Sequence, residues 1–190
     1  MKPRDDKKIR QVFDATLKIV NESGLSGITM SDIAKEAGLA TGTVYIYFKN
    51  KIDLINSLYS ECRKSSANVF FKDFDEHQPF KIGFGKIVSN IIKHRTGHFD
   101  EAVFMEQCNH SPFITETTKQ ASRQIMEPLF TLIEKGKKEQ LIKPLDTRLL
   151  LIYMIGCINE VIKQYRYNHK KIDKQLTTSL FTLCWDGLKL

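Results

Sequence analysis

Residues 29–51 constrain the fold of this chain more than any other stretch. They read TMSDIAKEAGLATGTVYIYFKNK. Thr29 is a good N-cap residue, and Asp32 three positions later completes a capping box, so the pattern predicts that a helix begins here. Gly38 is predicted to end this helix, because glycine takes the left-handed conformation of a helix C-terminus without a Cβ penalty. The stretch therefore opens with a short helix and a tight turn.

A second short helix is predicted directly after the turn. Val44 and Phe48 stand four residues apart, so they are expected to face the core together. Ala40 has no side chain that can cap this second helix, so Thr41 is expected to cap it instead. Asn50 is a strong N-cap residue for a further helix. The pattern is typical of a helix-turn-helix, which places its second helix in the DNA major groove; a plain helical hairpin is the alternative.

The residues of this stretch resemble a known family. Many positions at fixed spacing are similar to the signature of the TetR family of transcriptional regulators, densely over residues 9–58. The matching groups are Thr29–Asp32–Ile33–Ala34, Ala37–Gly38–Leu39, Gly42–Thr43–Val44–Tyr45 and Tyr47–Phe48–Lys49–Asn50–Lys51. The rest of the chain resembles the family in length and helical layout. The resemblance implies an all-α fold, with an N-terminal three-helix helix-turn-helix head and a helical ligand-binding and dimerisation domain.

The resemblance also implies which residues contact DNA. The positions that match phosphate contacts are Thr29, Thr43, Tyr47 and Lys51, and those near base edges are Thr41, Gly42 and Tyr45, with Ser31 placed to reach a base from the preceding helix. Thr41 cannot make the bidentate guanine contact of arginine or lysine, whereas Thr, Tyr and Ile side chains suit thymine methyl groups. The predicted operator is therefore thymine-rich at its contacted steps.

Composition narrows the class of protein. The 190 residues are 42% hydrophobic and 27% charged, as in ordinary globular proteins, and the net charge of +7 favours polyanionic partners. No signal peptide or apolar run of membrane-spanning length is present, so the cytoplasm is the predicted location and no membrane partner is expected. No phosphate loop, nucleophile elbow or zinc signature occurs, so neither an enzyme nor a cofactor is predicted. The four cysteines have no CxxC spacing and are expected to be buried.

The chain divides by pattern into a DNA-binding domain at residues 1–51 and an effector-binding and dimerisation domain at residues 52–190, joined by a connector helix that begins at residue 51. The three-helix head is small and is expected to gain stability by packing against later helices. A charged arm over residues 1–8, with Lys2 and Arg4, is expected either to fray or to contact DNA. Further along, Pro128 predicts one kinked helix or two abutting ones.

Two late helices are predicted to form a homodimer. Residues 147–167 are apolar almost all round, and residues 173–190 add Leu176, Leu180 and Leu183. A helix that is apolar on more than one face must be buried by more than one neighbour. A twofold dimer would supply that partner and would match a palindromic site; a large monomer core is the alternative.

The family's second domain commonly holds a small-molecule effector. The candidate lining residues here are Phe84, Val88, Phe104, Met105, Cys108, Phe113, Ile125 and Tyr153. Such side chains make adaptable walls and favour an apolar or amphipathic compound, although ordinary core packing explains each of them equally simply. His94, His98, His110 and Glu106 are possible polar anchors, and no pair is expected to bind a metal.

Taken together, these features predict a ligand-responsive, sequence-specific transcriptional regulator. It would bind a palindromic double-stranded DNA operator as a homodimer and act as a repressor that a small-molecule effector releases. The alternative is a protein of the same fold that binds DNA without sequence specificity, or that serves as an architectural or interaction protein.

Overall fold

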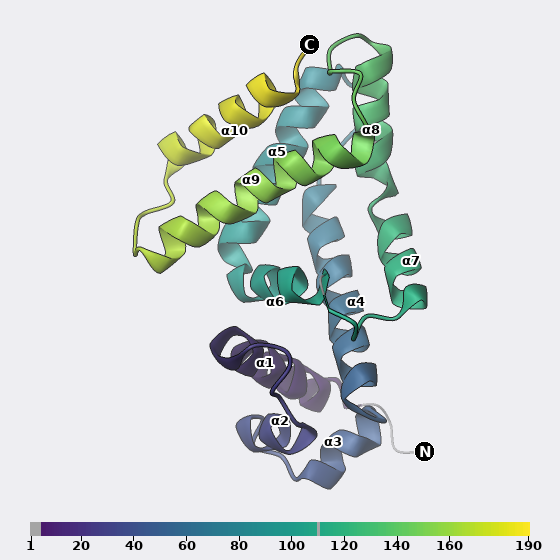
Figure 1. The fold of residues 1–190 in the computed structure, drawn as a ribbon, viewed down its shortest axis with the longest axis vertical. Coiled ribbons are helices and arrows are strands. Elements are labelled where there is room, and N and C mark those ends of the chain that lie inside the picture. The colour runs from purple at the N-terminus through teal and green to yellow at the C-terminus, as the bar shows by residue number, and fades with distance from the viewer. Residues whose placement is uncertain (1–4, 110) are drawn as a thin grey trace. The chain divides into compact units, whose positions relative to one another are not determined.

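The structure, a computed structural model, describes residues 5–109 and 111–190, and this part of the chain is all-α as predicted (Figure 1). Its helices are α1 (Asp6–Ser23), α2 (Met30–Glu36), α3 (Thr41–Tyr47), α4 (Lys51–Phe70), α5 (Phe80–Gly97), α6 (Phe99–Asn109), α7 (Glu116–Ile125), α8 (Glu127–Lys138), α9 (Thr147–Tyr167) and α10 (Lys174–Leu188). The candidates Lys2, Arg4 and His110 lie outside the described residues.

The first helix begins earlier than the predicted arm allows. The side chain of Asp5 accepts a hydrogen bond from the backbone N–H of Lys8 at 3.3 Å, so α1 starts at Asp6. The arm predicted to extend through residue 8 is therefore too long, because Asp5 is a good N-cap residue and starts the helix within that arm. The helix ends at Ser23, and Gly24 follows it with a φ of 80°.

The chain forms two compact units. The head unit comprises the described residues up to Arg63 together with Asp100–Ser122, and the body unit comprises Lys64–Phe99 and Arg123–Leu190. Packing thus assigns α6 to the head unit, although it follows the first body helix in sequence. The border predicted after residue 51 stays a prediction.

The head unit has a core of its own. Its buried side chains come from α1 to α4 and from α6, and they include Val12, Ile33, Val44, Phe48, Leu58, Phe104 and Cys108. A three-helix head alone would bury little apolar surface, which is why support from later helices was expected. That expectation is confirmed, because Phe104 and Cys108 of α6 are fully buried within this cluster.

The body unit packs α5, α8, α9 and α10 around an aromatic cluster. Phe84 lies 5.7 Å from both Phe80 and Trp185 and 6.3 Å from Phe181, measured between ring centroids. Pro128 lies in the first turn of α8, where its missing N–H costs nothing, so the second of the two predicted forms holds: α7 and α8 are separate helices.

The cysteines behave as small hydrophobes. Cys62, Cys108 and Cys184 are buried, Cys157 is half-buried, and all four are free thiols. Burial raises the pKa of Cys108 to about 12 and that of Cys184 to about 12, so both thiols stay neutral and unreactive at ordinary pH. No described helix is long and apolar enough to cross a membrane.

Gly136 tests how tightly the body unit is packed. A Cβ atom at this position would lie 2.6 Å from two carbons of the Phe80 ring and 2.7 Å from Cγ1 of Ile142. Gly136→Ala is therefore expected to lower the free energy of unfolding by about 1–3 kcal/mol through overpacking, measured by urea denaturation. The control is Gly97→Ala, whose Cβ would meet nothing within 4 Å. Equal stability of the two variants would contradict the tight packing at α8.

Candidate nucleic-acid interface

Thr29, the N-cap residue of α2, is hydrogen-bonded to Asp32 through both its hydroxyl and its backbone N–H. The Thr29 hydroxyl accepts from the backbone N–H of Asp32 at 3.2 Å, and the Asp32 carboxylate accepts from the backbone N–H of Thr29 at 3.1 Å. The bonds from the Thr29 hydroxyl and backbone lower the pKa of Asp32 below its usual value. The predicted capping box is confirmed, and it fixes where α2 begins.

The turn between α2 and α3 follows from Gly38. This glycine has a φ of 66°, in the left-handed region. It allows Leu39 N–H to donate to the Ala34 carbonyl at 2.9 Å and Gly38 N–H to donate to the Lys35 carbonyl at 3.1 Å. This pair of bonds is a Schellman motif, which satisfies the last carbonyls of α2 and reverses the chain tightly.

The second helix starts without the predicted cap. Ala40 is the N-cap residue of α3, and no side chain caps the helix, so the expectation that Thr41 would do so is wrong. Thr41 already lies inside the first turn. Val44 is fully buried and Phe48 is 1% exposed, as the spacing predicted. Burying these two residues turns the intervening side chains away from the core.

The predicted DNA-contacting residues lie mostly at the surface. Tyr45 is 51% exposed, whereas Tyr47 is half-buried and packs against the head core. The remaining candidates on α2 and α3 are exposed at Thr29, Ser31 and Gly42 and half-buried at Thr41 and Thr43. Ile46, which was not among the predicted contacts, is 68% exposed. Its place on the same outer face was readable from the helical period alone.

The Lys51 ammonium, like the Thr29 hydroxyl, already has hydrogen-bond partners within the head unit. Lys51 is half-buried at the start of α4, and its ammonium donates to the Ser26 carbonyl at 3.0 Å. The same ammonium lies 4.7 Å from the centroid of the Phe113 ring. Burial lowers the pKa of Lys51. In this arrangement the charge is engaged within the protein.

Two side-chain amides fasten the segment Asp100–Ser122 to the head helices. Gln107 donates to the Val20 carbonyl at 3.2 Å and accepts from the Leu25 N–H at 3.1 Å, next to the end of α1. Asn56 of α4 donates to the Phe113 carbonyl at 2.8 Å and accepts from the Thr115 N–H at 3.0 Å. Sequence reasoning missed both amides, because their partners are more than 50 residues away.

Comparison with known proteins matches both parts of the chain. A family model described as bacterial regulatory proteins, tetR family, matches residues 12–58, and one described as tetracyclin repressor-like, C-terminal domain, matches residues 59–190. The chain belongs to the TetR family. As a TetR-family protein it is a DNA-binding transcriptional regulator and not an enzyme.

Individual relatives agree with this assignment. The fatty acid metabolism regulator protein of Bacillus subtilis (strain 168) is 27% identical over 185 residues, which covers 95% of each chain. The solved structure of the transcriptional regulator FadR from Bacillus subtilis in complex with stearoyl-CoA is 26% identical, with a TM-score of 0.71 over 94% of this chain and 98% of that one. A TetR family transcription regulator from Marinobacter aquaeolei VT8 shares the fold, with a TM-score of 0.89, 22% identity and coverage of 100% and 99%.

The predicted effector residues of this TetR-family regulator fall into two groups. Phe104, Met105 and Cys108 are buried in the head core, with Phe113 partly buried against it. Phe84 and Val88 are buried in the body core, with Ile125 packed against that core, while Tyr153 is 46% exposed on α9. A surface groove of about 490 Å³ along α8 contains none of them and is lined by Glu127, Phe130, Thr131, Glu134, Lys135, Lys138 and Glu139.

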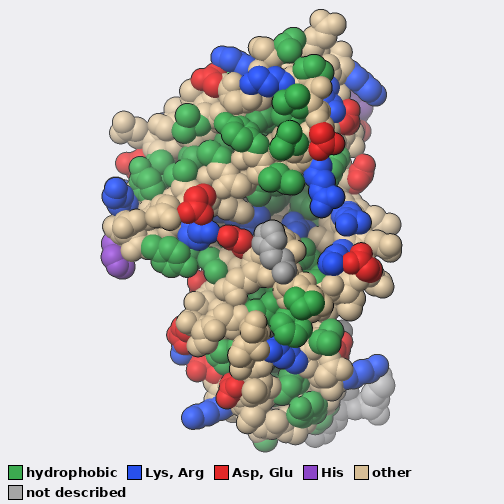
Figure 2. Space-filling view, in the orientation of Figure 1, with side chains coloured by type: hydrophobic (Ala, Val, Ile, Leu, Met, Phe, Trp, Pro, Cys, Tyr) green, Lys and Arg blue, Asp and Glu red, His purple; other side chains and the backbone are tan. Residues whose placement is uncertain are grey.

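The last two helices keep an apolar outer face. Leu149, Ile152 and Tyr153 of α9 and Leu183 of α10 are between 46% and 61% exposed. Hydrophobic side chains gather over these two helices in the space-filling view (Figure 2). Both helices also bury a second face in the body core, through Leu150, Met154 and Cys184 among others. The predicted two-faced character of these helices is confirmed by these exposures.

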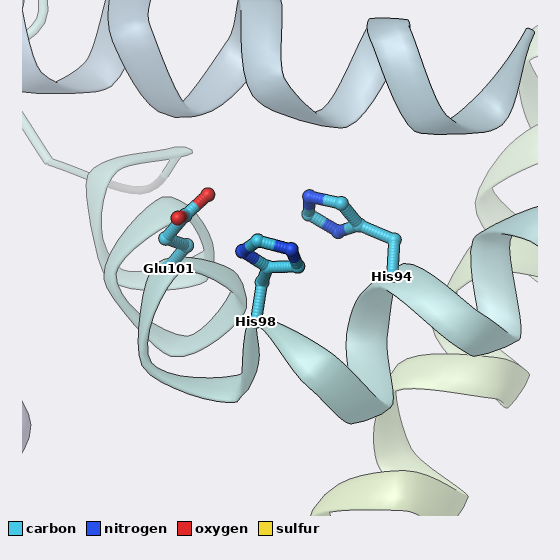
Figure 3. A group of neighbouring side chains, drawn as sticks. All are labelled: His94, His98 and Glu101. Carbon is cyan, nitrogen blue, oxygen red and sulfur yellow. The ribbon is translucent and has the colours of Figure 1, made fainter. Parts of the chain in front are cut away.

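Two histidines stand one turn apart at the end of α5. Their rings stack with centroids 4.7 Å apart and an interplanar angle of 11° (Figure 3). A ligand nitrogen of His94 and one of His98 lie within 4.8 Å of each other. That these residues bind no metal stays a prediction. Burial, helped by the charge of Arg95 and by His98, lowers the pKa of His94 to about 3.

The lowered pKa of His94 predicts acid sensitivity. Between pH 6.5 and about 3 the unfolded chain binds a proton at His94 that the folded protein does not, so stability is expected to fall as the pH decreases through this window. The slope from this one group approaches about 1.4 kcal/mol per pH unit. His94→Gln is expected to flatten the slope in urea denaturation, and His77→Gln, at an exposed loop position, is the control. An unchanged slope in His94→Gln would contradict the prediction.

Proposed function

We propose that this TetR-family regulator is a repressor that binds a palindromic operator as a homodimer and is released by an acyl-chain effector. The observation that carries the proposal is the outer face of α3, where Tyr45 and Ile46 are exposed on a helix whose opposite face is buried. Two apolar or hydroxyl-bearing side chains exposed on a short helix, in a protein of positive net charge, suit a DNA groove better than they suit water.

The homodimer is supported by the outer face of α9 and α10. Large apolar side chains exposed on two helices that pack against each other, such as Ile152 at 61% and Leu183 at 56%, are typical of an interaction surface. A twofold partner that presents the same face would bury both sets at once. The dimer would then hold two α3 helices about 34 Å apart, one turn of DNA.

The composition of α3 supports a thymine-rich operator. The helix has no charged residue between Thr41 and Tyr47, so it lacks the Arg or Lys side chain that makes the commonest specific contact with guanine. Ile46 and the ring of Tyr45 offer apolar contact to thymine methyl groups. Affinity would come instead from phosphate contacts by the hydroxyls of Thr29, Thr43 and Tyr47, by Lys51, and by the overall charge, while Thr41, Gly42 and Ser31 remain candidates near base edges.

A similar regulator and the aromatic cluster of the body core support an acyl-chain effector. The FadR structure that the chain resembles was solved with stearoyl-CoA. In this protein the aromatic cluster of Phe84, Phe181 and Trp185 brings α5 and α10 together, and Phe181 and Trp185 are only partly buried. The acyl chain would lie against this cluster, because a flexible apolar chain fits between side chains that are not fully closed in. The other predicted lining residues stay candidates; they are Val88, Phe104, Met105, Cys108, Phe113, Ile125 and Tyr153.

Selection from random double-stranded DNA tests the operator. The wild-type protein is expected to return a palindrome whose half-sites are one helical turn apart and rich in thymine. Its affinity for that duplex should exceed its affinity for a scrambled duplex by at least about 10³-fold at the same stated salt concentration. Equal affinity for both duplexes would favour non-specific binding, and guanine-rich half-sites would contradict the proposed reading by α3.

Matched variants separate reading from dimerisation in the same assay. Tyr45→Ala with Ile46→Ala is expected to lose the preference for the palindrome while remaining dimeric. Ile152→Glu places a charge on the apolar face of α9 and is expected to give monomers that bind the palindrome no better than a scrambled duplex. A dimeric Ile152→Glu protein, judged by sedimentation equilibrium, would remove α9 from the proposed interface.

Trp185 is the single tryptophan of the chain, so its fluorescence reports on the proposed effector site. Stearoyl-CoA is expected to change its emission in a saturable way and to weaken operator binding by about 5–150-fold. Coenzyme A without an acyl chain is the control and should do neither. Operator release without a change in Trp185 emission would place the effector elsewhere, and no release would contradict this effector class.

A further inference from the structure

The feature that carries a further inference is the arrangement around Lys51 within the head unit. Three parts of the chain meet there: the loop between α1 and α2 at Ser26, the first turn of α4 at Lys51, and the segment between α6 and α7 at Phe113. The Lys51 ammonium donates to the Ser26 carbonyl at 3.0 Å, and it lies 4.7 Å from the centroid of the Phe113 ring.

The Phe113 ring is held in place by its backbone. Its N–H donates to the Ser111 hydroxyl at 3.1 Å, and its carbonyl accepts from the Asn56 side chain at 2.8 Å. Asn56 also accepts from the Thr115 N–H at 3.0 Å. Asn56 and Lys51 stand on the same helix, so the backbone that carries the ring is anchored to the helix that carries the ammonium. An aromatic face at this distance attracts a cation through its quadrupole.

The Ser26 carbonyl accepts from one of the three N–H groups of the ammonium, and the Phe113 ring lies against another side of it. A DNA phosphate needs the same charge, because a lysine ammonium contacts phosphate as a point charge with its N–H groups directed at the oxygens. Partial burial of Lys51 lowers its pKa, in agreement with these contacts to protein groups. Lys35 and Lys49 of the same unit are exposed instead.

We propose that Phe113 is a positioning residue for DNA binding that acts through Lys51: its ring, with the Ser26 carbonyl, holds the Lys51 ammonium in competition with a DNA phosphate. This inference rests on the proposed function. It makes operator affinity depend on where the α6–α7 segment lies, because moving the ring away releases the ammonium for a phosphate contact.

The first test observes the wild-type protein by NMR. The Phe113 ring current should shift the ε-methylene protons of Lys51 upfield in the free protein. Adding the palindromic duplex obtained by selection should remove that shift, because the ammonium transfers to a phosphate. A shift that persists in the DNA complex would overturn the competition, and the absence of a shift in the free protein would overturn the ring contact.

The second test is a double-mutant cycle in DNA affinity. Phe113→Leu is expected to tighten binding to the palindrome by about twofold to fivefold, the equivalent of losing one exposed cation–π contact. It should also steepen the dependence of log affinity on log salt by about 0.9, the signature of one more phosphate contact. Phe113→Tyr keeps the ring and should behave as the wild type.

The cycle separates positioning from structure. In a Lys51→Met background Phe113→Leu should change neither affinity nor salt slope. Tightening that persists without Lys51, or weakening by Phe113→Leu alone, would overturn the proposal. Failure of the wild-type protein to prefer the palindrome over a scrambled duplex would instead count against the proposed function, and the ring-current shift in the free protein would still test the contact.

Discussion

The burial of Val44 and Phe48 is the interaction on which the DNA-binding part of this protein depends. Phe48 packs against Phe13 of α1 with ring centroids 5.6 Å apart, and Val44 is fully covered. Each residue of an α-helix turns the side chain by about 100°, so fixing positions 44 and 48 inward fixes positions 45 and 46 outward. The exposure of two large side chains on α3 is thus a consequence of packing on its other face.

The head is a unit larger than its helix-turn-helix. A head made of α1 to α3 alone offers few apolar contacts, and α6 supplies the missing ones through Phe104 and Cys108. The amides of Gln107 and Asn56 then tie this segment to the ends of α1 and α4. These bonds attach the segment Asp100–Ser122 to the helices that flank the helix-turn-helix.

The body unit combines a filled core with an apolar outer face on its last two helices. Its core is well filled, with little room for a methyl group at Gly136, yet α9 and α10 keep large apolar side chains outside it. Each of these two helices has one face that supports the fold and another that carries exposed apolar side chains. His94 of α5 limits the stability of this unit in acid, because its buried imidazole costs stability once it is protonated.

What the sequence determined by itself was local. Caps, glycine turns and helical periods involve residues within four or five positions of each other, so Thr29 with Asp32, Gly38, and the pair of Val44 and Phe48 were all readable before the structure. The fold class and the apolar faces of the last two helices came from the same short-range signals. Local rules also misjudged the starts of two helices. Asp5, within the predicted arm, caps α1, and α3 begins without a side-chain cap.

What only the tertiary structure decided was which distant residues meet. The contact between Lys51 and Phe113 joins residues more than 50 positions apart, and α6 packs in the head unit although α5 of the body unit precedes it. The effector candidates, which share one apolar pattern, divide between two cores. Such contacts depend on the packing of whole helices against each other, and many packings are compatible with the same periodic sequence. A lysine at a predicted DNA-contacting position therefore looks free in the sequence, and its contacts within the protein become visible once the helices are packed.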